Sequence, residues 1–288
     1  MPIVFGGIAP HGFPLIPELS DQAEGALRTR SALQELGRQF AESGADAVVI
    51  AGPHGVRVDG YVALAGTGRA AGTLAWNGRA VEMNVPVDIL LTDDIAARAR
   101  EMGVPVVTTG FAGNRRDQSV LPLDWGMLVP LWFLGHDRNV PGSGDVLSRT
   151  PEGDDGPSVV LVSPSRALPR QSLIDFGHAV ADAAETDGRR IAFIASCDWA
   201  HTHKESGPYG FHPLAEQVDR CVVDLIERNA LDKLRQISDQ DASSAAIDGL
   251  WQALMLQGVL ERAPMQVELL SYEAPTYYGM LVASWSAA

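Results

Sequence analysis

The sequence is poor in cysteine and contains no long apolar run. Its 288 residues include only Cys197 and Cys221, too few for a framework of disulfides or for a zinc site built from cysteine ligands. No apolar stretch approaches the roughly 20 residues that a membrane-spanning helix requires. The N-terminus also lacks the basic segment with which a secretory signal begins. These absences predict a cytoplasmic protein that does not enter a membrane.

Basic side chains are also scarce, because 22 lysines and arginines face 36 aspartates and glutamates. The resulting net charge of −14 repels nucleic-acid phosphates and argues against a nucleic-acid partner. Motifs of nucleophilic and phosphate-binding enzymes are missing as well, since there is no Gly-x-Ser-x-Gly elbow and no Walker loop. Gly66 and Gly68 do not follow a strand and open a helix, so they indicate turns and not a dinucleotide site.

Short apolar segments alternate with amphipathic segments of helical length. The strand-like segments are residues 3–8, 46–51, 61–65, 74–76, 81–85, 104–108, 158–162, 190–196, 266–272 and 279–284. The helix-like segments are residues 20–43, 88–102, 171–186, 213–227 and 243–258, with Ser20 as an N-cap and Gly258 as a C-cap. This alternation predicts an α/β fold, a single domain over residues 1–288 with a central, largely parallel or mixed sheet flanked by helices. Residues 135–157, rich in Gly, Pro, Asp and Ser, are predicted to form an exposed loop inserted into that domain.

Two of the seven histidines occupy nearly identical settings. His11 lies in Pro10-His11-Gly12 and His54 lies in Pro53-His54-Gly55, each directly after a predicted strand. In an open α/β sheet, ligands bind beyond the carboxyl ends of the strands. Neutral imidazole is the commonest metal ligand in proteins, so the pair predicts a metal site. The alternative is that each histidine is an ordinary turn residue.

A third strand, at 190–196, is followed by three further histidines within twelve residues. These are His201, His203 and His212. Successive side chains diverge, so only one of His201 and His203 readily points into a given pocket; the other is expected to support it. His136, in the predicted exposed loop, and His178, on a predicted helix, are interpreted as structural.

Several motifs together resemble a known family. They are Ala-Pro-His-Gly at 9–12, Gly-Pro-His-Gly at 52–55, Leu-Asp-Trp-Gly-Met-Leu-Val-Pro-Leu at 123–131, Ala-Ser-Cys-Asp-Trp-Ala-His at 195–201 and Asp-Gly-Leu-Trp-Gln at 248–252. In order and spacing they resemble the class III extradiol ring-cleavage dioxygenases, the LigB-like superfamily. The resemblance spans most of the chain and implies a single LigB-like catalytic domain.

The resemblance also implies a mononuclear non-haem Fe(II) centre, with Mn(II) as an alternative. In such enzymes two histidines and one carboxylate hold the metal on one face. His11 and His54 match the two histidines, and His201 matches the catalytic acid–base histidine. The family usually has Glu as the carboxylate, whereas the matching acid here is Asp248, which is shorter and requires a closer approach of its helix. Glu273 is the competing candidate.

Other side chains are candidates for contact with the substrate or for support of the site. His203 and His212 are expected to orient His201 or to meet substrate oxygens, or else to bond the backbone of their loop. Trp125 stands where many family members have His, and it could form a wall around an aromatic ring together with Tyr209 and Phe211. Arg115 and Arg116 could pair with a substrate carboxylate, although a solvated loop is the more ordinary interpretation of that segment.

The expected activity is cleavage of a catecholic ring beside its diol, with both atoms of O2 entering a ring-opened semialdehyde-type product. The expected partners are therefore a catecholic small molecule and O2, and the resemblance implies a homo-oligomer. Two other functions stay open at the level of sequence. One is a metal-free binding or interaction protein on the same fold, and the other is a zinc metallohydrolase using the same ligands.

Overall fold

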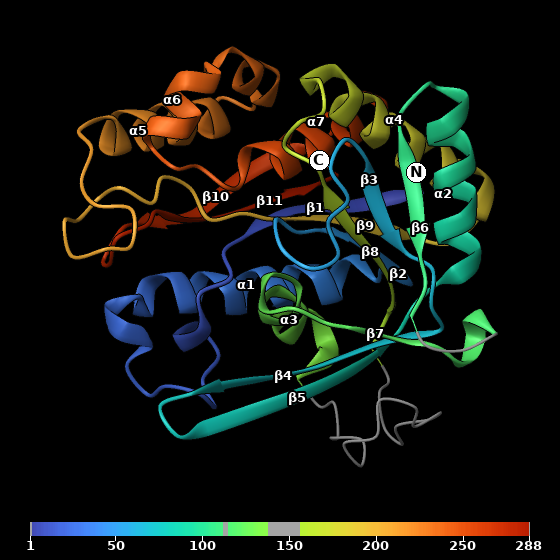
Figure 1. The fold of residues 1–288 in the computed structure, drawn as a ribbon, viewed down its shortest axis with the longest axis horizontal. Coiled ribbons are helices and arrows are strands. Elements are labelled where there is room, and N and C mark those ends of the chain that lie inside the picture. Colours follow the sequence, from blue (N-terminus) through green and yellow to red (C-terminus); the bar gives the residue numbers. More distant parts are fainter. Residues whose placement is uncertain (1, 112–114, 138–155, 288) are drawn as a thin grey trace.

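A computed structural model describes residues 2–111, 115–137 and 156–287 (Figure 1). Most of the predicted loop at 135–157 lies outside these residues. An eight-stranded sheet runs through the centre in the order β10-β11-β1-β9-β2-β8-β3-β6. Its strands are β1 (Ile3–Ala9), β2 (Ala47–Ala51), β3 (Val62–Ala65), β6 (Val106–Thr109), β8 (Ser158–Pro164), β9 (Ile191–Ser196), β10 (Gln266–Glu273) and β11 (Met280–Ser286).

The middle of this sheet is parallel, and this arrangement positions the site. Strand β9 pairs in parallel with both β1 and β2, and β2 pairs in parallel with β8. The contacts of β11 with β1 and of β3 with β8 are antiparallel. Every residue of β2 and β9 is buried, because both faces of the sheet are covered, and this explains why the segments are continuous apolar runs. The carboxyl ends of β1, β9 and β2 therefore meet at one edge.

Helices cover both faces of the central sheet (Figure 1). One core cluster packs β-strand residues such as Ile8 and Phe193 against α2 (Ile89–Glu101), α4 (Arg170–Asp187), α5 (Leu214–Glu227) and α7 (Leu250–Arg262). The other packs Phe5 and Ile50 against α1 (Leu27–Ser43), α3 (Trp125–Leu131) and a small second sheet. The predicted α/β fold with a central mixed sheet flanked by helices is confirmed.

The second sheet has the strand order β5-β4-β7. The hairpin of β4 (Arg69–Trp76) and β5 (Arg79–Pro86) is antiparallel, and β7 (Val120–Pro122) joins β4 in parallel. Helix α3 contacts both β4 and β9, so it connects the two sheets. The hairpin thereby reaches the same edge of the molecule at which the parallel strands end, and its Trp76 lines the cavity described below.

The predicted helix at 20–43 begins seven residues late, at Leu27. Ala23, Glu24 and Gly25 all have positive φ angles, of 49°, 48° and 86°. Left-handed residues cannot continue a right-handed helix, so the chain forms a separate 3₁₀ turn at Ala23–Gly25. Ser20 is therefore not the N-cap of α1.

The predicted helix at 243–258 is in fact two helices. Helix α6 (Asp239–Ser244) ends before Ala246, whose φ is +49°, and α7 begins at Leu250. Gly258 does not end α7, which continues to Arg262. It lies instead at the crossing with α4, where an added Cβ would come within 2.0 Å of the carbonyl oxygen of Ile174. The glycine permits close packing of α4 against α7. The turn at 245–249, between α6 and α7, carries Asp248.

His136 does not lie in an exposed loop as the sequence predicts. It ends a π-helical segment, Trp132–His136, and is completely buried because the apolar run before it continues into the core. His178 lies on α4, where its Nε2 is 2.7 Å from a carboxylate oxygen of Glu261. Cys197 is buried and Cys221 exposed, and both are free thiols. Among the described residues, no helix has the length and apolarity to cross a bilayer.

Candidate metal centre

His11 and His54 meet at the edge where the parallel strands end. His11 follows β1 and His54 follows β2, and both strands pair with β9 between them. The centroids of the two imidazole rings are 5.2 Å apart, and their planes are perpendicular. The repeated strand–Pro-His-Gly pattern therefore brings the two histidines together.

Asp248 reaches this pair from the turn before α7. One nitrogen of His11, one of His54 and one carboxylate oxygen of Asp248 all lie within 4.8 Å of one another. The turn approaches β9 closely because of Gly249, where an added Cβ would come within 2.5 Å of the Cβ of Cys197. The backbone N–H of Gly249 also donates to the carbonyl of Asp198, at 2.9 Å. This close packing provides the nearer helix approach that a short aspartate requires.

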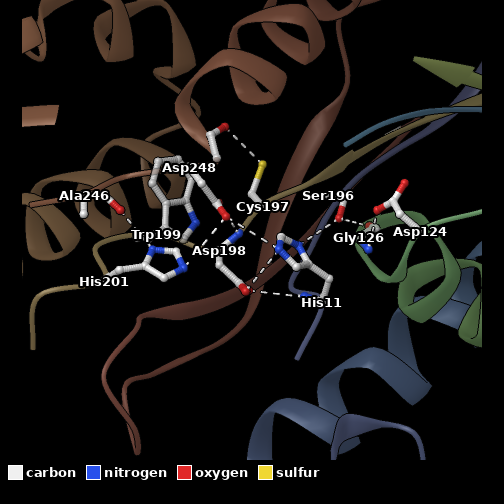
Figure 2. Close-up of polar contacts among 11 residues, drawn as sticks. His11, Asp124, Gly126, Ser196, Cys197, Asp198, Trp199, His201, Ala246 and Asp248 are labelled. Carbon is white, nitrogen blue, oxygen red and sulfur yellow. Dashed lines mark hydrogen bonds and ion pairs between the residues drawn. The ribbon is translucent and has the colours of Figure 1, made fainter. Parts of the chain in front are cut away.

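The ring of His11 is oriented by a chain of hydrogen bonds (Figure 2). The hydroxyl of Ser196 donates its only proton to the carbonyl of Gly126. Its oxygen, 3.0 Å from Nδ1 of His11, must therefore accept a proton from that nitrogen. Nε2 of His11 then points toward Asp248 Oδ2, 3.6 Å away, and Asp198 Oδ2, 3.3 Å away. In a neutral ring this tautomer leaves the lone pair of Nε2 directed at the centre.

The centre attracts positive charge. Burial by itself would lower the pKa of His11, but the carboxylates of Asp198 and Asp248 outweigh it and raise the pKa to about 9. Burial likewise works to raise the pKa of Asp248, and the hydrogen bond and charge of His11 reverse this and lower it. A proton on His11 satisfies the buried carboxylates in the bare protein. A divalent cation would replace that proton and satisfy the same carboxylates.

His54 is already suited to bind a metal as a neutral ligand. Burial, followed by the nearby charge of His11, lowers the pKa of His54 to about 4. Its ring lies 4.3 Å from that of Trp125, at an interplanar angle of 34°. Gly126 leaves room for this arrangement, since a Cβ there would be 3.0 Å from Cδ2 of His54. Near neutral pH, His54 therefore offers an unprotonated nitrogen.

His201 lies on the side of Asp248 opposite to His11 (Figure 2). Its hydrogen bonds select one tautomer of the neutral ring. Its Nδ1 lies 2.7 Å from the carbonyl oxygen of Trp199 and 2.9 Å from that of Ala246. Carbonyl oxygens only accept hydrogen bonds, so Nδ1 carries the proton and Nε2 of the neutral ring is unprotonated. Nε2 lies 3.8 Å from Asp248 Oδ2. The ring also stacks on Tyr278, with centroids 5.4 Å apart and planes 17° apart.

Asp198 is a member of the site that the sequence interpretation did not single out. It lies two residues after the end of β9, and its Oδ1 accepts the backbone N–H of His11 at 3.2 Å. Its own N–H donates to Asp248 Oδ1 at 3.0 Å, and burial raises the pKa of its carboxyl group. With His201 and Asp248 it forms a second group of potential ligands. The available signal in the sequence was an acidic residue just beyond a buried strand and three residues before a candidate histidine.

Glu273 lies elsewhere, at the end of β10. Its Oε1 accepts hydrogen bonds from the backbone N–H of Thr29 at 2.7 Å and from the Thr29 hydroxyl at 2.6 Å. The carboxylate thus stabilises the first turn of α1 and does not line the cavity at the centre. Of the two carboxylates that the sequence offers as the third ligand, the geometry favours Asp248.

The centre opens into a cavity of about 520 Å³, here called the central cavity. Its polar lining includes His11, His54, Glu24, Arg166, Asp198, His201, Asp248 and Thr276, and its aromatic lining consists of Phe13, Trp76, Trp125, Tyr209, Tyr277 and Tyr278. Apolar and aromatic walls around a few convergent polar groups are typical of small-molecule sites. Of the three aromatic candidates from the sequence, Trp125 and Tyr209 lie here and Phe211 does not.

His203 and His212 do not line the central cavity. They lie in a separate hollow of about 530 Å³, the α5 hollow, lined by His203, Phe211, His212, Pro213, Ala215, Glu216, Gln217, Arg220, Tyr272 and Ala274. Nε2 of His203 is 2.8 Å from Oδ2 of Asp219, whose Oδ1 accepts the backbone N–H of Ala200. Nδ1 of His212 accepts the N–H of Leu214 at the start of α5. Their contacts are supporting ones, and Phe211 also lies in this hollow.

The two arginines considered for a substrate carboxylate are paired on the surface. Arg115 contacts the carboxylate of Asp117, and Arg116 contacts that of Asp93 through two nitrogens at 2.9 Å. Neither side chain lines the central cavity. The ordinary interpretation, a solvated segment, agrees with these contacts.

Comparisons with known proteins agree with this architecture. A family model described as the catalytic LigB subunit of aromatic ring-opening dioxygenase matches residues 8–283. Protein CA_C1420 of Clostridium acetobutylicum is 26% identical over 269 residues, which cover 92% of this chain and 54% of that protein. The chain thus spans about half the length of this curated relative.

A solved structure also shares the fold. It is that of JW3007, an uncharacterized protein of Escherichia coli K12, which superposes with a TM-score of 0.59 over 98% of this chain and 99% of its own. The identity between the two sequences is 13%, so the likeness concerns the fold alone.

Proposed function

Because the chain belongs to the LigB family, the catalytic subunits of aromatic ring-opening dioxygenases, we propose that it is an Fe(II)-dependent extradiol dioxygenase. Its substrate is a catechol, cleaved beside the diol with both atoms of O2 to give a ring-opened semialdehyde-type product. The observation that carries the proposal is the meeting of His11, His54 and Asp248 within 4.8 Å, at the wall of an aromatic cavity.

The donor set fits the metal of this proposal. Two imidazoles and one carboxylate form the arrangement typical of non-haem Fe(II) oxygenases, in which further positions stay open for substrate. Two observations support the same conclusion. The hydrogen bond from His11 to Ser196 orients the ring, and the buried carboxylates attract positive charge. When bound, Fe(II), or Mn(II) as the alternative, would supply the redox chemistry that lets triplet O2 react with a closed-shell catechol.

His201 would act as the proton carrier. His201 lines the cavity, and Nε2 of its neutral ring accepts a proton from a catechol hydroxyl as the substrate binds. The carbonyls of Trp199 and Ala246 hold the Nδ1 proton, and with the nearby Asp248 carboxylate they stabilise the resulting imidazolium. Because stacking on Tyr278 fixes the ring, the same nitrogen can return the proton to an oxygen of the substrate during cleavage.

The aromatic walls would orient the substrate ring and exclude water. Trp125 and Phe13 contact each other at a centroid distance of 5.7 Å, and Tyr209 contacts His201 at the same distance. A flat aromatic substrate would lie between such faces, with its diol toward the ligands. Enclosure strengthens the electrostatic contacts at the centre, because less water screens them.

The proposal is tested by loading the protein with Fe(II) without oxygen and then measuring O2 uptake with a panel of catechols. Uptake with a yellow product is expected, together with about one iron per chain. Asp248→Ala should lose both iron and uptake, whereas Glu273→Ala, its matched control, should retain both. A protein that binds no iron, or that binds zinc in preference and consumes no O2 with any catechol, would overturn the proposal.

A further inference from the structure

Arg166 is a charged member of the central cavity that the proposed mechanism does not use. It follows β8, which pairs in parallel with β2, so its segment arrives at the same edge as the metal ligands. Among the described residues that line the cavity, Arg166 is the single lysine or arginine. The other charged groups there, apart from histidines, are the acids Glu24, Asp198 and Asp248. Apart from the metal centre itself, Arg166 is therefore the one place in the described lining of this cavity that attracts an anionic part of a substrate.

The guanidinium of Arg166 is positioned but not neutralised. It lies over the ring of Trp251, with Cζ 4.9 Å from the ring centroid. Within the described parts of the chain, no carboxylate forms an ion pair with it, although Arg115, Arg116 and Arg170 are all paired with aspartates. A guanidinium that lies over an aromatic ring keeps its N–H groups able to bind a carboxylate through two bonds.

Arg166 also lies where the central cavity continues into a wider surface groove. That groove, of about 1040 Å³, shares Arg166, Tyr209 and Ala246 with the central cavity and extends along Trp251 and Arg235. A substituent on the substrate ring could thus pass Arg166 and reach solvent. Trp251 stands on α7, three residues after Asp248, so one segment positions both the metal ligand and the platform of the arginine.

We propose that Arg166 binds a carboxylate on the substrate, so that the preferred substrates are catechols with an acidic substituent. The choice of catechols rests on the proposed function, whereas the binding of an aromatic carboxylate at Arg166 does not. Because the carboxylate is remote from the reacting ring, its bonds are the same in the bound substrate and in the transition state. They are therefore expected to act on KM more than on kcat.

The test compares 3,4-dihydroxyphenylacetate with the neutral 4-ethylcatechol in the iron-loaded enzyme. The wild type should prefer the acid, and Arg166→Gln should reduce the ratio of the two kcat/KM values by about 10- to 100-fold, as expected for a charge-assisted bidentate contact. Arg166→Lys should retain part of the preference. Arg115→Gln, the same substitution at an arginine outside the cavity, should leave the ratio unchanged.

A binding measurement separates this inference from the proposed reaction. Calorimetry without oxygen should detect binding of 4-hydroxyphenylacetate to the wild type, weakened at least tenfold in Arg166→Gln, with 4-ethylphenol as the neutral comparison. If no catechol is consumed but this difference is found, the reaction is wrong and the carboxylate site stands. If catechols are consumed and Arg166→Gln leaves both the ratio and the binding unchanged, the carboxylate site is wrong and the reaction stands.

Discussion

Two neighbouring histidines of the segment after β9 lie in different hollows. His201 lines the central cavity, and His203 lines the α5 hollow. In His201, two carbonyls accept the Nδ1–H, so the lone pair of the neutral ring is on Nε2. In His203, Nε2 is itself bound to the buried carboxylate of Asp219, which Tyr272 and the N–H of Ala200 also contact. The same side chain is thus available for proton transfer in one hollow and committed to structure in the other, and hydrogen bonding decides which.

Exchanging either histidine for glutamine tests this contrast most strongly. His201→Gln should lower kcat by about 100- to 10,000-fold, the usual worth of a general acid–base group, with iron content unchanged. His203→Gln retains a donor for Asp219 and should lower kcat by no more than about tenfold, since a supporting contact acts through position alone. Oxygen uptake and iron analysis measure both variants. Equal losses would show that the two rings do not differ in role.

The charge of the centre predicts a pH dependence of stability in the metal-free protein. The pKa of His11 is raised from 6.5 to about 9, so the folded state holds a proton that the unfolded chain releases above pH 6.5. The stabilisation is fully present below pH 6.5 and is lost as the pH rises to about 9. The loss is about 3 kcal/mol as an upper bound, at 1.36 kcal/mol for each unit of pKa.

Urea unfolding of the metal-free protein at pH 6.5, 7.5, 8.5 and 9.5 measures this loss. The variant His11→Gln should show a much smaller decline over the same range. With metal bound, the cation replaces the proton, and the decline should shrink in the wild type too. A wild type whose free energy of unfolding stays constant from pH 6.5 to 9.5 would contradict the predicted electrostatics.

Substitutions in the α5 hollow should lower the free energy of unfolding, whereas substitutions in the central cavity should lower kcat. Asp219→Asn removes a buried charge that receives hydrogen bonds from His203, Tyr272 and Ala200, and it places amide protons against at least one of these donors. The expected cost is about 1–3 kcal/mol in the free energy of unfolding, the range for a buried polar group left unsatisfied. Leu225→Ala, an apolar truncation on α5, controls for general weakening of that helix. A variant as stable as the wild type would show that the network carries no stabilisation.

The sequence predicted the meeting of His11 and His54 because both signals are local. A buried parallel strand is a continuous apolar run, and parallel strands of one sheet end at the same edge. Two strand–Pro-His-Gly patterns are therefore enough to predict that the two histidines lie close together. The position of Asp248 was harder to predict. The apolar spacing of 243–258 runs through the turn at 245–249, and an alanine with positive φ at 246 leaves no signal in the sequence.

The division of roles between His201 and His203 could not be predicted from their own segment. It depends on Asp219 from α5, Tyr272 from β10 and the carbonyl of Ala246 before α7, which are distant in the sequence. Likewise, the sequence does not show that Arg166 lacks an ion pair in the described parts of the chain. Which arginines pair with aspartates depends on how the folded surface brings them together. Local patterns thus identified the strand-end histidines, whereas tertiary contacts determine the hydrogen bonds that each of them makes.

Substitution of His212 has the smallest expected effect. It also tests whether the α5 hollow is separate from the central cavity. Its Nδ1 accepts the N–H of Leu214 at 3.2 Å, so it satisfies one of the unpaired donors at the start of α5. His212→Ala should lower the free energy of unfolding by about 0.5–1 kcal/mol, as loss of a helix cap does. His212→Asn retains a side-chain acceptor and should restore most of that loss. Because His212 does not line the central cavity, neither substitution should change the pH profile of kcat/KM, and a shifted profile would place His212 in contact with the substrate after all.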